Sequence, residues 1–143
     1  MNIQTLDTAP INERGGQRSH LLVGRGQFGA ENLAITWVEA GPGSMQAVHG
    51  HPDNEQVYVI VRGRGVMHVG DDMQEVGEGT LVFIPPGAAH AIKNAGDEPL
   101  VFLSATSPPF DPKEMEAYFR YKEPGLEQGT RSKEQGTRER SRT

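Results

Sequence analysis

The chain has 143 residues, the usual length of one domain, and it contains no cysteine. Its formal net charge is -5 and it has no basic stripe, so a nucleic-acid partner is not expected. No apolar stretch reaches the roughly 18 residues of a membrane span, and the N-terminus lacks a signal-peptide pattern. We therefore expect a cytoplasmic protein with no membrane partner.

Residues 1–19 have no clear periodicity and are interpreted as an N-terminal arm. Residues 20–110 consist of short apolar runs separated by Gly and Pro, a pattern typical of an all-β sandwich or barrel. In chain order, the runs are LLVG, LAITWVEA, QVYVIVRG, VMHVG, TLVFIPP, AIKN and LVFLSAT. We predict an antiparallel barrel of six to eight strands or more.

The sequence changes character at Asp111, which suits a helix N-cap, and Pro112 suits the first helical turn. Apolar residues then recur at helical spacing, so a short helix is predicted at 111–121. Its apolar side is expected to pack on the barrel or across a dimer. Residues 122–143 carry six Lys or Arg and four Asp or Glu, and they include EQGTR twice. This segment has too few apolar residues to offset the entropy of ordering, so it is interpreted as a disordered basic tail.

Three histidines stand out because they can reach one point. His49 and His51 are two residues apart, and on an extended strand both imidazoles lie on the same face. His90 follows the Pro85-Pro86-Gly87 turn about 40 residues later, and this turn can return a third imidazole to that point. Convergent imidazoles form a site for a divalent metal ion.

The two stretches that contain these histidines resemble the two sequence motifs of the cupin superfamily, in particular its small single-domain bacterial members. The first stretch reads Gly43-x5-His49-x-His51 and ends at Gly63, and the second reads Gly79-x5-Pro85-x-Gly87-x2-His90-x3-Asn94. The resemblance implies a jelly-roll barrel that holds one divalent metal ion on His49, His51 and His90 plus a fourth ligand. It also implies a homodimer.

The fourth ligand has two candidates. Counting back from Gly63 gives Gln56, whereas counting forward from His51 gives Glu55. Both faces of this strand are apolar, so strand parity does not decide between them. We favour Gln56, because the whole run to Gly63 sets the register of the strand while the preceding loop can absorb one residue. Three imidazoles and an amide would leave the charge of the ion uncompensated, which favours an anionic substrate or a bound hydroxide.

Other polar residues have plainer interpretations. Tyr58 shares strand parity with Gln56, so we name it as a candidate catalytic residue that offers its hydroxyl to substrate or to a metal-bound water; core filling is the alternative. His20 and His68 occupy no motif position and are interpreted as structural. Asn94 is expected to bond to the backbone of a turn.

The favoured function is that of a mononuclear metalloenzyme of dioxygenase or isomerase type, acting on a small oxygenated metabolite. The ion would be Fe, Mn, Ni or Zn, and the resemblance slightly favours Fe or Mn. One alternative is a non-catalytic binding or sensing protein, in which the metal only anchors a small ligand. A structural partner protein is a third possibility.

Overall fold

The computed structural model describes residues 1–111. These residues form nine β-strands and one 3₁₀ helix, η1 (Gln27–Gly29). Apart from Asp111, the helix expected at 111–121 and the tail expected at 122–143 lie outside the described residues, and both stay predictions. Within the described part of the chain, no helix is long and apolar enough to cross a membrane.

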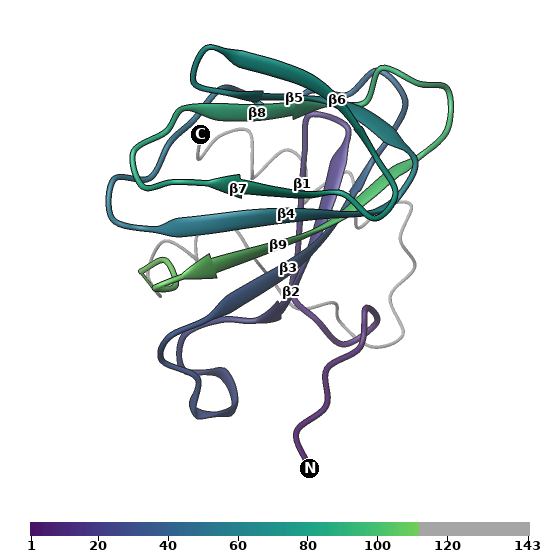
Figure 1. Ribbon diagram of the computed structural model, residues 1–143. Helices are drawn as coiled ribbons and strands as arrows, with labels where there is room; N and C mark the ends of the chain where they lie inside the picture. The colour runs from purple at the N-terminus through teal and green to yellow at the C-terminus, as the bar shows by residue number, and fades with distance from the viewer. Residues whose placement is uncertain (112–143) are drawn as a thin grey trace.

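The nine strands form two antiparallel sheets that face each other. The larger sheet contains, in spatial order, β1 (Ile11–Arg14), β2 (Gln17–Val23), β3 (Ala34–Ala40), β9 (Leu100–Ser107), β4 (Glu55–Arg62) and β7 (Leu81–Ile84). The smaller sheet contains β6 (Asp72–Gly77), β5 (Arg64–Val69) and β8 (His90–Lys93). In Figure 1, β7, β4, β9 and β3 lie side by side, and the smaller sheet lies above them.

The core lies between the sheets and takes one side of each strand. On β4, Tyr58 and Ile60 are at most 2% exposed, whereas Val57 and Val59 on the opposite side are half-buried. The buried cluster consists of Val38, Ala40, Tyr58, Ile60, Met67, Val76, Ile84, Ile92, Leu100 and Phe102. The predicted fold class, an all-β antiparallel jelly-roll barrel, is confirmed.

Each of the seven apolar runs overlaps one strand of the structure. The other two strands, β1 and β6, have no such run. β1 is an edge strand of the larger sheet, and Ile11 is its single buried residue. β6 is an edge strand of the smaller sheet, and its first four residues are exposed. Edge strands with little buried surface need few apolar residues, which is why sequence pattern misses them. The sheet thus begins at Ile11, inside the segment 1–19 that we interpreted as an arm.

Gly63 lies where the chain leaves the larger sheet for the smaller one. Its φ is +84°, and a β-carbon there would lie 2.5 Å from the Pro99 carbonyl oxygen. Both facts exclude a side chain at this position. The motif glycine therefore allows the β4–β5 corner to pass close to the start of β9.

Candidate metal centre

The two motif stretches are joined by backbone hydrogen bonds at the histidines. His49 and His90 form an isolated antiparallel bridge, with N–O distances of 3.1 Å and 2.7 Å. The amide of Gly87 donates to the carbonyl oxygen of His51 at 2.9 Å. The positions of all three histidines are thus fixed by main chain, and only their ring torsions are left to other contacts.

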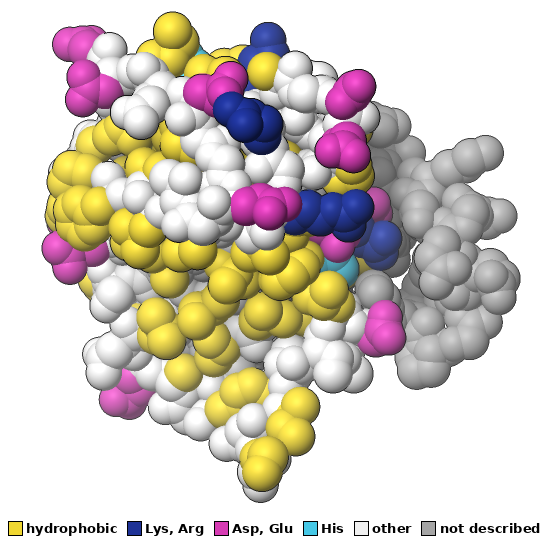
Figure 2. Space-filling view, turned by 45° about the vertical axis from the view of Figure 1, so that its right-hand side comes forward, with side chains coloured by type: hydrophobic (Ala, Val, Ile, Leu, Met, Phe, Trp, Pro, Cys, Tyr) yellow, Lys and Arg dark blue, Asp and Glu magenta, His cyan; other side chains and the backbone are white. Residues whose placement is uncertain are grey.

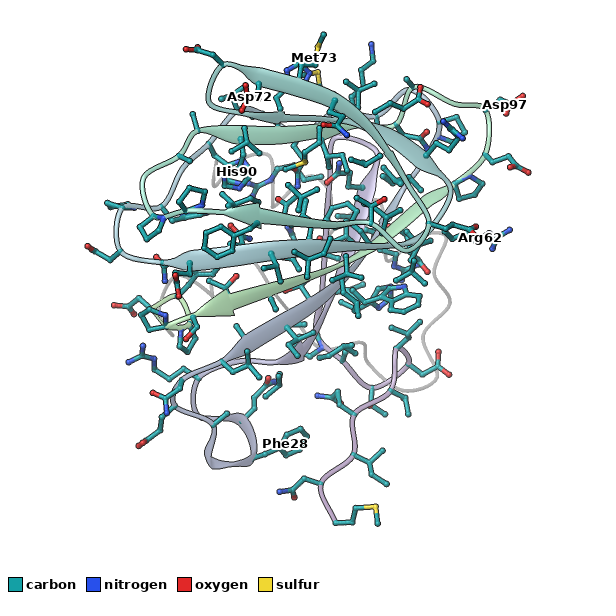
Figure 3. All side chains as sticks on the ribbon, viewed as in Figure 1. Phe28, Arg62, Asp72, Met73, His90 and Asp97 are labelled. Carbon is teal, nitrogen blue, oxygen red and sulfur yellow. The ribbon has the colours of Figure 1, made fainter. Side chains whose placement is uncertain are left out.

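The three imidazoles converge as the sequence predicts. The ring centroids lie 5.4 Å apart for His49 and His51, 4.2 Å for His49 and His90, and 6.0 Å for His51 and His90. One nitrogen from each ring can be chosen so that all three lie within 4.8 Å of one another. Figure 3 shows His90 pointing into the space between the sheets, whereas Arg62 points outward at the edge of the molecule.

Two of the rings are oriented by carbonyl oxygens two residues earlier in the chain. Nδ1 of His49 lies 2.8 Å from the oxygen of Ala47, and Nδ1 of His90 lies 3.0 Å from the oxygen of Ala88. A carbonyl can only accept, so each Nδ1 carries the proton and each Nε2 keeps its lone pair. Nε2 of His90 is buried without a hydrogen-bond partner. That pattern is the one expected of an imidazole ready to bind a metal.

Burial favours the neutral form of two histidines of the cluster, His90 and His51. It lowers the pKa of His90, and the charges of His49 and His51 lower it further, although the bond to Ala88 opposes this. Burial also lowers the pKa of His51, and the charge of His49 adds to the effect. The neutral imidazole is the metal-binding form, so the protein environment favours the state that a ligand needs.

Gln56 and Glu55 lie on opposite faces of β4. Gln56 is 6% exposed and faces the core side, where its Nε2 donates to Oγ of Ser104 at 2.8 Å. Its Oε1 is buried and has no hydrogen-bond partner. Glu55 is exposed, and its carboxylate does not belong to the group of side chains that converge with the histidines.

Tyr58 is the next residue after Gln56 on the inner face of β4, and its ring stands edge-on to His90 with centroids 5.8 Å apart. Its hydroxyl donates to Oε1 of Gln46 at 3.2 Å. Burial raises the pKa of Tyr58 to about 12, although this hydrogen bond acts in the opposite direction. The side chain is therefore a neutral phenol whose proton is already donated to an amide.

Several functional neighbours escaped the sequence analysis. Gln46 accepts from Tyr58 and also from the amide of Ile92 at 3.1 Å, and Ser104 accepts from Gln56. Phe110 packs on the ring of His51, with centroids 4.5 Å apart. Gln46 lies inside the first motif, between its glycine and its first histidine, and this position was the only available signal. Ser104 lies on β9 and Phe110 follows it, and both lie near the residues that they contact because β9 pairs with β4. The sequence alone does not show this pairing.

The remaining histidines lie outside the cluster. Nδ1 of His20 lies 3.2 Å from the carbonyl oxygen of Leu6, and its Nε2 lies 3.4 Å from the carboxylate of Glu39, so it links the N-terminal segment to β3. His68 is half-buried on β5, opposite Met73 and Ala91. Asn94 donates to the carbonyl oxygens of Ala40 and Glu98.

A hollow of about 510 Å³ lies beside the histidines without including them. Its walls come from β5, β6, β7 and the residues next to them: Met67, Val69, Asp72, Met73, Gln74, Val76, Thr80, Leu81, Val82, Phe83 and Pro85. Two of these residues are cross-strand partners of the site, because Val69 pairs with His90 and Val82 pairs with Tyr58. The hollow is thus adjacent to the site, and its lining mixes apolar side chains with Asp72, Gln74 and Thr80.

The donor set fits a divalent ion. Three imidazole nitrogens converge, and two buried atoms, Nε2 of His90 and Oε1 of Gln56, have lone pairs but no protein partner. An unpaired buried acceptor costs about 1–3 kcal/mol, so a cation bound at the three imidazoles would offset this cost at Nε2 of His90. These residues could hold one metal ion.

Comparisons with known proteins show the family. The cupin-domain profile matches residues 36–106. The oxalate-binding protein of Thermotoga maritima is 30% identical over 97 residues, which cover 65% of this chain and 79% of that protein. An uncharacterized protein of Methanocaldococcus jannaschii is 36% identical over 74 residues, which cover 52% of this chain and 59% of that protein.

Glucose-6-phosphate isomerase of Thermococcus kodakarensis is 36% identical over 61 residues, covering 39% of this chain and only 32% of the enzyme. Among solved structures, a predicted oxalate decarboxylase from Thermotoga maritima superposes with a TM-score of 0.68 at 21% identity. The match covers 76% of this chain and 99% of that one. Fold, motifs and relatives lead to one conclusion: the chain belongs to the cupin family.

Proposed function

We propose that the protein is a mononuclear metal-dependent cupin that binds a small oxygenated anion at its histidine cluster. The observation that carries this proposal is the convergence of three imidazoles, one of which, His90, has a buried Nε2 without a hydrogen-bond partner. Buried polar atoms normally have partners, so this unpartnered nitrogen supports a missing ligand. Oε1 of Gln56, on the inner face of β4, is a second buried acceptor without a partner.

In this proposal, His49, His51 and His90 bind the ion through ring nitrogens, and Gln56 binds it through Oε1. Ser104 holds the amide of Gln56 by accepting from its Nε2, so that Oε1 is left as the free acceptor. The bound ion would supply Lewis acidity at open coordination positions. All four protein ligands are neutral, so the charge of the ion is left for an anionic ligand to balance.

Relatives support an anionic ligand, because one is named for oxalate and another for a sugar phosphate. The enzyme proposal is a dioxygenase or isomerase acting on a small oxygenated metabolite, with Tyr58 beside the reacting atoms. The Tyr58 hydroxyl would donate to a ligand near His90 only by giving up its hydrogen bond to Gln46, and its raised pKa disfavours a role as base.

A second candidate is a non-catalytic binding protein, in which the metal anchors the anion and no turnover follows. It is favoured by a specific observation: within residues 1–111, no carboxylate converges with the histidines. The cluster therefore lacks a carboxylate base, which proton-transfer chemistry commonly uses. The identity of the ion (Fe, Mn, Ni or Zn) and a cytoplasmic location stay predictions.

The test begins with metal content of protein purified without added metal, and continues with oxalate and glucose 6-phosphate as probes. We expect about one ion per chain and anion binding that requires the ion. Consumption of a probe with Fe(II) under oxygen, or conversion of the sugar phosphate, supports an enzyme. Binding without consumption supports the second candidate. Protein that binds neither metal nor anion contradicts both.

The larger sheet has a second notable surface, its outward face, which is apolar. Two rows of side chains cross four strands, because Val57 pairs with Phe83 and Ala105, while Val59 pairs with Leu81 and Leu103. We name this surface the outer apolar face; its members are Ile35, Trp37, Val57, Val59, Leu81, Phe83, Leu103 and Ala105. Figure 2 shows a broad hydrophobic area on the molecule.

We propose that a second copy of the chain covers the outer apolar face, giving a homodimer. A standard interface uses about 20–30 residues on each side, with an apolar centre and a polar rim, so eight apolar residues match the centre of one. Residues 1–111 carry a net charge of about -7, and an uncharged face is where two such bodies can meet with least repulsion. A two-fold axis is the commonest way for one surface to bind itself.

A further inference from the structure

His51 differs from the other two histidines of the cluster in what holds its ring. His49 and His90 each donate from Nδ1 to a carbonyl oxygen, and this bond fixes both tautomer and torsion. Within residues 1–111, no hydrogen bond to the ring of His51 is present, and this side chain is half-buried. Metal-binding histidines usually have such a second bond, so another contact must orient this ring.

Phe110 provides that contact. Its ring packs on the ring of His51 with centroids 4.5 Å apart and an angle of 49° between the planes. Contact with the ring restricts rotation about the side-chain torsion, yet it leaves the in-plane nitrogens accessible. An aromatic neighbour can therefore hold His51 in a binding orientation without competing for its lone pair.

Phe110 is itself held by residues from distant parts of the chain. Ser107, the last residue of β9, donates from its side-chain Oγ to the carbonyl oxygen of Asn32 at 2.7 Å. Asn54, just before β4, donates from Nδ2 to the carbonyl oxygen of Pro108, and Arg25 donates from Nη2 to that of Pro109 at 3.2 Å. Hydrogen bonds on three consecutive residues, two of them to backbone carbonyls, thus hold the segment that leads into Phe110.

We infer that Phe110 is a positioning residue for the metal site: it orients His51, and the segment 107–110 delivers it there. The inference rests on the proposed function, since it assigns Phe110 a role toward the ion. The contact between Phe110 and His51 also couples two events, because metal binding and attachment of segment 107–110 both favour the same orientation of the His51 ring. Removal of the Phe110 ring should weaken metal binding without removing a ligand.

The experiment compares Zn²⁺ affinity of the full-length protein and its variants, measured by competition with a chromophoric chelator. We expect Phe110→Ala to weaken binding about 10-fold, the lower end for loss of a ligand-orienting contact. Phe110→Tyr should bind Zn²⁺ with the affinity of the unchanged chain, because this substitution keeps the aromatic ring. Phe28→Ala is the matched control, since Phe28 is an exposed aromatic residue on η1, outside the cluster.

A second measurement separates positioning from loss of fold. In NMR spectra of the metal-free protein, Phe110→Ala should shift the ring protons of His51 by removing a ring current, while those of His90 stay within a small fraction of that change. If Phe110→Ala does not fold, Arg25→Ala replaces it, with an expected affinity loss of about 3-fold, since only one anchor of the segment is removed.

The outcomes are distinct. No Zn²⁺ binding by the unchanged chain contradicts the proposed function itself. Tight binding by the unchanged chain with equal affinity in Phe110→Ala overturns the inference and leaves the proposed function intact. Equal loss in Phe110→Ala and Phe110→Tyr also overturns it, because the ring would then not be the cause.

Discussion

The two faces of the larger sheet differ in an unexpected way. Its inner face combines the apolar core with three buried polar side chains, Gln56, Tyr58 and Ser104, whereas its outward face carries two rows of apolar side chains. In an ordinary half-buried sheet the outward face is polar. Here the polar groups inside are tolerated because hydrogen bonds satisfy most of them, and the exception, Oε1 of Gln56, is the atom that we propose as a metal ligand.

This contrast shows that an apolar side chain in a strand does not by itself indicate a buried position. β4 is apolar on both faces, so its sequence gives no direction, and only its pairing shows which face looks inward. We propose that the inner face contributes a ligand to the metal ion and that the outer apolar face binds a second copy of the chain. Each half of the comparison can be tested by substitutions that leave the other half unchanged.

The largest effect is expected from His90→Ala on the inner face. It removes a proposed ligand, so metal affinity should fall by more than the roughly 100-fold upper range for second-shell changes. Metal content after dialysis and chelator competition measure the loss. His68→Ala is the matched control, because His68 lies on β5 outside the cluster. Equal metal content in His90→Ala and the unchanged chain would contradict the site.

The outer face is tested by Val59→Asp, which places a charge on β4, one of the two inner strands of the four that the apolar rows cross. Val59 lies between Leu81 and Leu103, so an aspartate there would be desolvated in the dimer. We expect dimer affinity to fall by about 2 kcal/mol, or roughly 30-fold, as seen by analytical ultracentrifugation.

Met73→Asp is the control for this change, because Met73 is an exposed apolar residue on β6, outside the outer apolar face. Its dimer affinity should match that of the unchanged chain. Two results would refute the proposal: a monomer at all concentrations in the unchanged chain, or a stable dimer in Val59→Asp. In the first case the face would need a different occupant.

A finer test of the inner face is Gln56→Glu. A carboxylate at this position would balance part of the charge of the ion, so we expect metal affinity to rise about 10-fold, which is roughly 1.4 kcal/mol. Anion binding to the loaded protein should weaken for the same reason. Glu55→Gln is the control, since Glu55 is exposed and should leave both affinities unchanged. The reverse result would make Glu55 the fourth ligand.

The smallest effect is expected from Tyr58→Phe, which removes the hydrogen bond to Gln46. Oε1 of Gln46 keeps the amide of Ile92 as a donor, so the free energy of unfolding should fall by only about 1 kcal/mol. Urea unfolding at pH 8 measures this difference. A variant as stable as the unchanged chain would show that the bond contributes nothing net.

The same variant has a pH signature. Burial raises the pKa of Tyr58 to about 12 from its ordinary value near 10, so the unfolded chain ionises first. The contribution of Tyr58 to stability is complete below pH 10 and is lost as the pH rises through 10 toward 12. The stability difference between the unchanged chain and Tyr58→Phe should therefore shrink above pH 10, as unfolding at pH 8 and 11 would show.

Sequence pattern gave the fold class and the convergence of the three histidines, because alternating runs and fixed motif spacing are local signals. It could not find β1 or β6, whose residues are mainly polar or exposed. Nor could it choose the side of β4 that faces inward, because both sides are apolar. Phe110 escaped for another reason: its contact with His51 joins residues far apart in the chain, and only the path of β9 brings them together.

The side chain of Gln46 links the two sheets to the loop that carries the first histidine. One amide oxygen accepts from Tyr58 on β4 and from the amide of Ile92 on β8, so it fastens the loop before His49 to both sheets. Any fluctuation that swings this loop outward must also release the Ile92 amide to solvent. Hydrogen exchange at that amide thus reports how often the histidine loop opens, and a rate close to that of global unfolding would mean that the loop and the two sheets unfold as one cooperative unit.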